Sequence, residues 1–239
     1  MEQPLPAAVA IEQLGFRWPG ASGEVLILEQ LRIERGERLF IEGPSGSGKS
    51  TLLGLLAGVH TPQRGTLEVL GTALETVSSA GRDHFRAHHI GYIFQLFNLI
   101  PYLSVVENVT LPCRFSALRR ERALRRFATL EQEALHLLGH LDLSDPKLLQ
   151  RPVTALSVGQ QQRVAAARAL IGSPELLIAD EPTSALDRDR CESFLALLFQ
   201  ECQASGTTLI FVSHDSGLEP LFDRTLRLAE MNRANWRNL

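Results

Sequence analysis

The apolar positions near the start of the chain follow a short, partly alternating pattern. In segments 9–16, 25–33 and 38–41, apolar residues alternate in part with polar ones, and glycines punctuate the segments. Alternation with a period of two is typical of half-buried strands. We therefore predict three short strands, the last of which runs directly into a glycine-rich loop and then into an apolar helix at 50–58.

The pattern changes in the middle of the chain. Strand formers become few between about residues 103 and 149, and helical spacing occurs at 104–109 and 117–139. This change predicts an inserted helical subdomain, which we place at about 97–155.

The last part of the chain returns to alternating elements. Strand-like segments at 176–179 and 207–212 flank a helical segment at 188–204. Strands that alternate with helices are typical of a parallel sheet with helices on its faces. We therefore expect an α/β core that opens and closes the chain, and a single domain over residues 1–239.

Composition narrows the classes of protein. The 239 residues suffice for one sizeable core, and hydrophobic residues (44%) and charged residues (21%) occur at ordinary globular frequencies. The net charge is 24 − 27 = −3, which gives no electrostatic reason to expect a nucleic-acid partner. Cys113, Cys191 and Cys202 have no CxxC spacing, so we expect reduced thiols and no zinc site.

No segment of the sequence is expected to cross a membrane. The first ten residues lack the basic and apolar regions of a secretory signal, and the longest apolar stretches, at 52–59 and 176–179, are far shorter than a bilayer-spanning helix of about 20 residues. If the protein acts at a membrane, other subunits must supply the span.

The glycine-rich loop carries the first chemical motif. Its sequence GPSGSGKS matches G-x-x-x-x-G-K-[ST] between a predicted strand and a predicted helix, so that backbone N–H groups and the helix N-terminus converge on an anion. Lys49 would reach the β- and γ-phosphates of a nucleotide, and the Ser50 hydroxyl would bind Mg²⁺. The alternative is a glycine and serine turn with a surface lysine. The expected phosphate-binding residues are Gly43, Pro44, Ser45, Gly46, Ser47, Gly48, Lys49, Ser50 and Thr51.

An acidic pair follows the buried strand at 176–179. Ligands of open α/β sheets bind at the carboxyl ends of strands, where Asp180 and Glu181 stand. Asp180 suits the Mg²⁺ shell through a water molecule, and Glu181 would then act as a general base on the attacking water. The alternative is an acidic cluster that stabilises a helix N-terminus near Pro182.

Further motifs resemble one known family along nearly the whole chain. The sequence LSVGQ at 156–160 resembles the LSGGQ signature of the nucleotide-binding subunits of ABC transporters, and SALD at 184–187 resembles their D-loop. Gln95 resembles the Q-loop glutamine, and His214 the H-loop histidine. With the glycine-rich phosphate loop and the strand that ends in Asp180 and Glu181, six motifs occur in the order of that family.

The resemblance implies a fold and a mechanism. The fold is a P-loop NTPase core with an N-terminal antiparallel β subdomain and the inserted helical subdomain. The mechanism is ATP hydrolysis in a dimer with two composite sites, in which the signature helix of one subunit closes over the γ-phosphate held by the other. The implied catalytic residues are Glu181, His214, Gln95 and Lys49, the implied Mg²⁺ site comprises Ser50, Gln95 and Asp180, and the implied additional nucleotide contacts are Ser157, Gly159, Gln160 and Asp187.

Two positions call for comment against the family pattern. Val158 replaces the commoner glycine of the signature, and a β-branched residue would be costly there if the backbone needed a positive φ. The family also stacks an aromatic residue on adenine upstream of the phosphate loop. Trp18 stands where that residue belongs, and Phe16 is the alternative.

The segment 91–101 and the residues 107–109 look most like the lipoprotein-release, macrolide-efflux and antimicrobial-peptide group. That likeness favours an export subunit, peripheral on the cytoplasmic side of the membrane, whose partners are a second copy and separate permease subunits, with no nucleic acid. Two alternatives are a soluble ABC ATPase acting on nucleic acid or ribosomes, and a nucleotide-binding regulatory module without turnover. A single cassette, the lack of a heptad run and the net charge of −3 disfavour the former.

An arginine run marks the predicted helical subdomain. Its members are Arg119, Arg120, Arg122, Arg125 and Arg126. A solvated helix face is the simplest interpretation. Attraction to anionic lipid headgroups or to an acidic element of a membrane partner is the alternative.

Overall fold

The computed structural model describes residues 6–149, 151–184 and 187–234. The chain divides into two compact units. The first unit contains Met1–Arg86 and Thr208–Leu239, and the second contains Ala87–Thr207.

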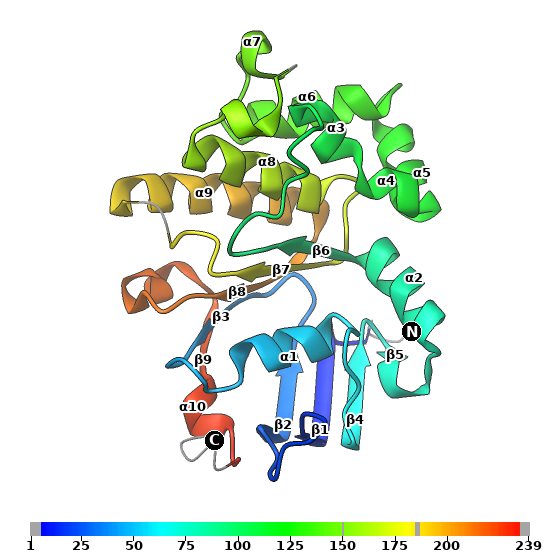
Figure 1. Ribbon diagram of the computed structural model, residues 1–239, viewed down its shortest axis with the longest axis vertical. Helices are drawn as coiled ribbons and strands as arrows, with labels where there is room; N and C mark the ends of the chain where they lie inside the picture. Colours follow the sequence, from blue (N-terminus) through cyan, green and yellow to red (C-terminus); the bar gives the residue numbers. More distant parts are fainter. Residues whose placement is uncertain (1–5, 150, 185–186, 235–239) are drawn as a thin grey trace, which may run out of the picture. The chain divides into compact units, whose positions relative to one another are not determined.

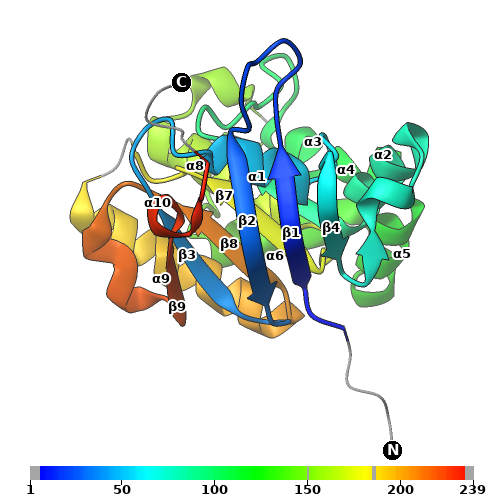
Figure 2. The ribbon, with the colours of Figure 1, turned by 90° about the horizontal axis from the view of Figure 1, so that it is seen from below.

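The first unit begins with an antiparallel sheet. Its order is β2 (Leu26–Ile33), β1 (Val9–Phe16), β4 (Arg64–Val69) and β5 (Thr72–Ala73), and Figure 2 shows β2, β1 and β4 side by side. The predicted strands at 9–16 and 25–33 are confirmed, and so is the antiparallel β subdomain. The sequence did not reveal β4, because its first three residues are exposed and only Leu67 and Val69 turn into the core.

The same unit holds three parallel strands. The central strand β3 (Arg38–Glu42) pairs with β8 (Thr208–Val212) on one side and with β9 (Arg224–Arg227) on the other. All five residues of β8 are buried, as expected for a parallel strand covered on both faces. The phosphate loop follows β3 and leads into α1 (Lys49–Leu56), and the remaining short elements are η1 (Leu74–Thr76), η3 (Ser216–Leu221) and α10 (Leu228–Met231).

The second unit combines a strand pair with helices. β6 (Ile90–Ile93) and β7 (Leu176–Asp180) are parallel neighbours, and α2 (Ser79–His89), most of which belongs to the first unit, leads the chain into β6. Its other elements are α3 (Val105–Thr110), α4 (Pro112–Phe115), α5 (Ala117–Arg126), α6 (Leu130–His140), α7 (Pro146–Leu149), η2 (Val153–Ala155), α8 (Val158–Leu170) and α9 (Arg188–Ser205). The α/β class is confirmed: parallel strands and helices share one chain with an antiparallel sheet (Figure 1).

The single helix predicted at 117–139 is wrong, because two helices occupy this segment. α5 ends where Phe127 becomes extended, with φ −135° and ψ 150°. α6 begins at a new N-cap, Thr129, whose side chain accepts a hydrogen bond from the Gln132 N–H at 3.1 Å. Threonine favours such a cap over a helix interior, and the break turns one long pattern into a helical hairpin.

Helix α8 is the central helix of the second unit. It packs against α3, α6 and β6. Its approach to β6 is so close that a Cβ on Gly91 would lie 2.3 Å from the carbonyl oxygen of Ala169, so only glycine fits there. The alanines and Val164 on its buried face make this close packing possible.

The solvated face predicted for the arginine run is wrong for Arg119 and Arg122. Arg119 is 3% exposed and donates from Nε to the Ile171 carbonyl at 2.8 Å and from a terminal nitrogen to the Ala169 carbonyl at 2.6 Å. It therefore caps the C-terminus of α8, whose last carbonyls have no partner within the helix. Arg122 binds the Glu175 carboxylate with both terminal nitrogens, at 2.9 and 2.6 Å.

The sequence predicts no membrane-spanning segment and three reduced cysteines. None of the helices in the described residues is both long and apolar enough to cross a membrane. The three cysteines are buried and form no disulfide with one another, and burial raises the pKa of Cys113 to about 11, so this thiol is protonated at neutral pH.

Candidate active site

The phosphate loop has the backbone of an anion cradle. Gly46 and Gly48 take φ values of +80° and +99°, the left-handed region in which side chains other than glycine are strained. Gly48 is also the N-cap of α1, and no side chain caps this helix. The first N–H groups of α1 are therefore available to a ligand, and the positive end of the helix dipole lies there.

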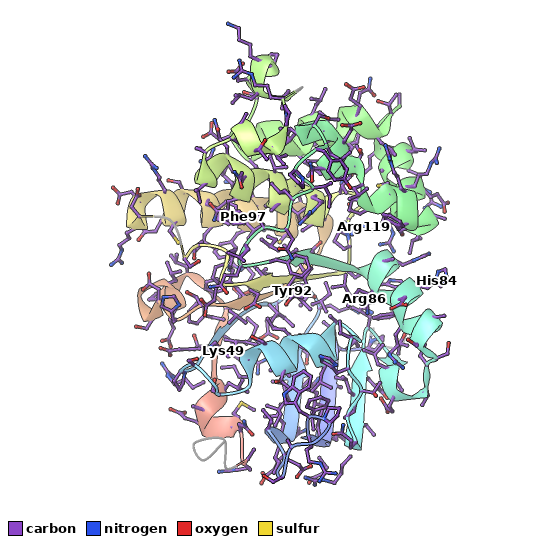
Figure 3. All side chains as sticks on the ribbon, viewed as in Figure 1. Lys49, His84, Arg86, Tyr92, Phe97 and Arg119 are labelled. Carbon is purple, nitrogen blue, oxygen red and sulfur yellow. The ribbon has the colours of Figure 1, made fainter. Side chains whose placement is uncertain are left out.

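The polar side chains of the loop fit a polyphosphate. The Lys49 ammonium lies at the start of α1 (Figure 3) and donates to the loop carbonyls of Gly43 and Pro44, at 2.5 and 3.1 Å. The Ser47 hydroxyl is buried without a hydrogen-bond partner among the described residues. A Cβ at Gly46 would meet nothing within 4 Å, so open space lies at that point of the loop. An ammonium, an orphaned hydroxyl and uncapped amides together suit phosphate oxygens.

Asn232 supports the loop from the end of the chain, and sequence reasoning missed it. Its amide nitrogen donates to the carbonyls of Ser47 and Val25, at 3.1 and 2.9 Å, and its Oδ1 accepts from the N–H of Ile27 at 2.9 Å. The side chain is buried and ties β2 to the phosphate loop. No periodic or motif signal marks this residue, because its partners lie about 200 positions earlier in the chain.

Trp18 is the accessible ring of the two candidates for stacking on a base. Phe16 is 3% exposed and belongs to the core, whereas Trp18 is 39% exposed. The Trp18 ring meets Phe16 and His60 edge to face, at centroid distances of 5.1 and 4.8 Å. It also lines a cavity of about 340 Å³ with Arg17 and Gln63. These contacts fix the ring and leave it one exposed side.

His214 lies beside the phosphate loop. It follows β8, is exposed, and lines a cavity of about 290 Å³ together with Gly43, Pro44 and Arg227. Two predicted site elements of the first unit, the phosphate loop and His214, are therefore neighbours. A histidine at the wall of a cavity next to a phosphate cradle is placed to contact a phosphate oxygen.

The acidic pair and Gln95 meet in the second unit. β6 and β7 are parallel, so the residues that follow them emerge at the same edge. Gln95 Nε2 donates to Glu181 Oε2 at 3.4 Å. Glu181 has a φ of +45°, a strained value for a residue other than glycine, and such strain concentrates at functional positions. Burial raises the pKa of Tyr92 in β6, and the negative charge of Asp180 adds to this effect.

The donor set indicates which metal the site suits. No group of three His, Cys, Asp or Glu side chains that could hold an ion occurs in the described part of the chain. Mg²⁺ needs no such cage, because it keeps water ligands and binds one or two carboxylates together with substrate phosphates. Asp180 and Gln95 supply oxygen ligands of that kind in the second unit, and the Ser50 hydroxyl supplies one in the first unit.

The signature segment forms the N-terminus of α8. Ser157 is the N-cap: its Oγ accepts from the Gln160 N–H at 3.4 Å, while its own N–H donates to Gln160 Oε1 at 2.9 Å. This capping box uses the hydroxyl as an acceptor and leaves its proton for a ligand. Gly159 is at the second helical position, close to the helix N-terminus.

Val158 is compatible with this geometry. It is the first residue of α8, 49% exposed, and does not have a positive φ. A β-branched residue would be costly here only at a positive φ, so valine is not strained at this position.

Asp187 is the N-cap of α9. Its side chain accepts a hydrogen bond from the Arg190 N–H at 3.0 Å, and the Arg190 side chain pairs with it at 3.3 Å. Ala185 and Leu186 of the predicted D-loop lie outside the described residues. Asp187 thus has a structural role in α9 besides the nucleotide contact expected from the resemblance.

Comparison with known proteins decides the family. The ABC transporter family model matches residues 29–184. The uncharacterized ABC transporter ATP-binding protein YbbA of Escherichia coli (strain K12) is 44% identical over 228 residues, which cover 94% of this chain and 96% of YbbA. The chain belongs to the family of ABC transporter ATP-binding proteins. Among its ABC relatives, the lipoprotein-releasing system ATP-binding protein LolD of Psychrobacter arcticus is 39% identical over 91% of each chain.

Two further similarities bear on the ATPase. The macrolide export ATP-binding/permease protein MacB 2 of Aeromonas hydrophila is 38% identical over 96% of this chain, which spans 34% of that longer protein. The solved ABC cassette MJ0796, a dimer in a post-hydrolysis state with ADP and Pi, has a TM-score of 0.78 and 30% identity over 95% of this chain and 97% of its own. This chain is accordingly an ABC-type ATPase that binds ATP, as predicted.

Proposed function

We propose that this ABC subunit dimerises on ATP and drives separate membrane permease subunits of an exporter for lipids, lipoproteins or peptides. The observation that carries the proposal is that one chain has two helix N-termini suited to phosphate, at α1 and at α8. One nucleotide needs a single phosphate cradle. A second phosphate-ready helix end is explained if it closes over the ATP of another copy.

Each proposed residue has a role that its chemistry permits. Lys49 and the α1 amides neutralise the phosphates, and Trp18 stacks on adenine. Ser157 donates its hydroxyl proton, and Gly159 its N–H, to the γ-phosphate of the other copy, with Gln160 holding the cap. Asp187 also contacts the ATP bound between the two copies.

Hydrolysis then depends on three further groups. Glu181 orients and deprotonates the attacking water, which adds to the γ-phosphorus as the bond to the ADP oxygen breaks. His214, beside the phosphate loop, contacts the γ-phosphate. Ser50, Asp180 and Gln95 are the residues that would hold Mg²⁺, and the ion would supply positive charge to the phosphate oxygens.

Exposed apolar side chains support a permease partner. Leu96 and Tyr102, which follow Gln95, are each 83% exposed. Exposed apolar side chains that gather in a patch are typical of binding surfaces. A permease element seated there would sense a change at Gln95, since Leu96 is the next residue. Export, rather than import, and the cytoplasmic location are proposed from the likeness to the exporter group.

The proposal is tested by purification from membranes in mild detergent, with identification of the co-purifying proteins. Glu181→Gln should bind ATP, turn over at least about 100-fold more slowly, and accumulate as an ATP-bound dimer. Glu192→Gln, an exposed carboxylate of α9 that pairs with Arg188, is the matched control and should keep wild-type turnover. A permease that co-purifies and raises Glu181-dependent turnover is the expected result. Capture of nucleic acid or ribosomes without any membrane protein would favour the soluble alternative.

A further inference from the structure

Arg168 is a buried cation in α8 that the proposed mechanism does not use. Its side chain is 9% exposed on a buried helix face that, apart from Gln162, is otherwise made of alanine, valine and leucine. The two terminal nitrogens donate to the carbonyls of Phe97, at 2.5 Å, and Asn98, at 2.7 Å. Burial lowers the pKa of Arg168 to about 10, so the guanidinium remains charged at neutral pH. Figure 3 labels Phe97, which lies close to α8.

The two residues that Arg168 holds have unusual backbones. Phe97 has a φ of +59° and Asn98 a φ of +49°, so two consecutive residues other than glycine are left-handed. Asparagine tolerates this region, but phenylalanine does not favour it, and such a conformation persists only where the surroundings impose it. A planar guanidinium that binds both carbonyls at once is such a constraint, and a lysine ammonium cannot reproduce its fork.

The constrained loop carries Gln95. Phe97 is two residues after Gln95, whose amide reaches the Glu181 carboxylate at 3.4 Å. Helix α8 holds the loop on the Glu181 side as well, because buried Gln162 donates to the Pro182 carbonyl at 3.0 Å. Helix α8, which has Ser157 at its N-terminus, therefore forms hydrogen bonds with both loops, the one that bears Gln95 and the one that bears Glu181.

We propose that Arg168 is a positioning residue for ATP hydrolysis: its clamp on the Phe97 and Asn98 carbonyls fixes Gln95 against Glu181 and ties both to the helix that begins at Ser157. The inference rests on the roles proposed above for Gln95 and Glu181. In this proposal Arg168 does not contact the nucleotide. Its effect should therefore fall on kcat and leave the KM for ATP, which depends on the phosphate loop, nearly unchanged.

A double-mutant cycle tests the clamp on the full-length purified chain. Arg168→Lys should lower kcat at least about fivefold with less than a twofold change in KM, because the charge stays but the double contact is lost. Gln95→Ala should lower kcat as well. In the Gln95→Ala background, Arg168→Lys should lower kcat less than twofold further, because both changes remove the same positioning. Arg163→Lys is the control: Arg163 lies on the same helix but contacts Asp142, and kcat should stay within twofold of wild type.

Several results would overturn the inference. The clamp does not act through Gln95 if Arg168→Lys lowers kcat by the same factor in both backgrounds, or if Gln95→Ala has no effect while Arg168→Lys does. Glu181→Gln is measured in parallel. Wild-type turnover in that variant would refute the proposed base, while the coupling between Arg168 and Gln95 would still decide the clamp.

A second pair of variants leaves the buried arginine intact, in case Arg168→Lys does not fold. Asn98 is exposed, so its substitution leaves no cavity in the core. Asn98→Gly keeps the left-handed backbone accessible and should keep kcat within twofold of wild type. Asn98→Ala disfavours that backbone and should lower kcat about threefold or more, with KM unchanged. Equal kcat values for the glycine and alanine variants would refute the claim that the loop conformation positions Gln95.

Discussion

Replacement of Arg119 by methionine tests the cap on α8 most directly. Methionine keeps an unbranched apolar chain of similar length, so the packing of α5 on α8 is largely preserved. The substitution removes the strong hydrogen bonds to the Ile171 and Ala169 carbonyls and a weaker contact to the Arg168 carbonyl at 3.4 Å. These acceptors are at the end of a buried helix, where water cannot replace the donors.

The expected loss of stability in Arg119→Met is the difference between two opposing effects. Each hydrogen bond from a charged donor contributes about 1.5–3 kcal/mol, so the two short ones together contribute roughly 3–6 kcal/mol. Removal of the buried charge returns part of this, since burying a guanidinium costs several kcal/mol, a cost that also lowers the pKa of Arg119 to about 10. We expect a net loss of about 3 kcal/mol in the free energy of unfolding, or a Tm lower by roughly 6–12 °C.

Thermal unfolding followed by circular dichroism, with urea titration as a second measure, provides the assay. Arg120→Met is the matched control, because Arg120 is the next residue of α5 and is exposed, and its substitution should change stability by less than about 0.5 kcal/mol. Equal Tm values for the two variants would show that the cap contributes nothing net. That result would refute the expected net loss of stability for Arg119→Met.

Three other substitutions have defined outcomes. Asn232→Asp keeps the acceptor for the Ile27 N–H but replaces the donor to the Ser47 carbonyl by an oxygen. The KM for ATP in a steady-state assay should therefore rise about tenfold. An unchanged KM would show that Asn232 does not support the phosphate loop. Val158→Gly should lower the free energy of unfolding by about 0.5–1 kcal/mol in urea titration and leave ATP turnover within twofold, whereas a large gain in turnover would show that valine impairs the signature. Burial favours a higher pKa for Glu175, but hydrogen bonds from Arg122 and His89 outweigh it and lower the pKa from 4.5 to about 2. The carboxylate therefore contributes stability above pH 4.5 that is lost as the pH falls towards 2, and the Tm difference between wild type and Glu175→Gln should shrink over that interval.

The sequence predicted the elements that carry motifs better than the residues that hold them in place. Strands β1, β3 and β7 lie within a residue or two of their predicted bounds, because apolar runs bounded by glycine or acidic residues specify them locally. Their carboxyl ends place the phosphate loop and Glu181, so the catalytic motifs could be positioned without a structure.

The supporting residues could not be found in the same way. Arg119 stands in a helix that looks fully solvated, because the carbonyls it caps are about 50 positions further along the chain. Arg168 left a usable signal, since a charged residue in the middle of a buried alanine face must find polar partners. The identity of those partners, a left-handed loop about 70 residues earlier, follows only from tertiary contacts.

The two ends of α8 differ in how they respond to salt. A buried guanidinium saturates the negative end of the helix, whereas the positive end, at Ser157, is exposed to solvent. Mobile ions screen the exposed end and cannot reach the buried one. In the dimer proposed above, a higher ionic strength should therefore weaken the attraction of the signature end for a phosphate on another copy and leave the buried cap at the other end of α8 unchanged. Salt should thus act on assembly of the proposed ATP-bound dimer more strongly than on the buried C-terminal cap of this helix.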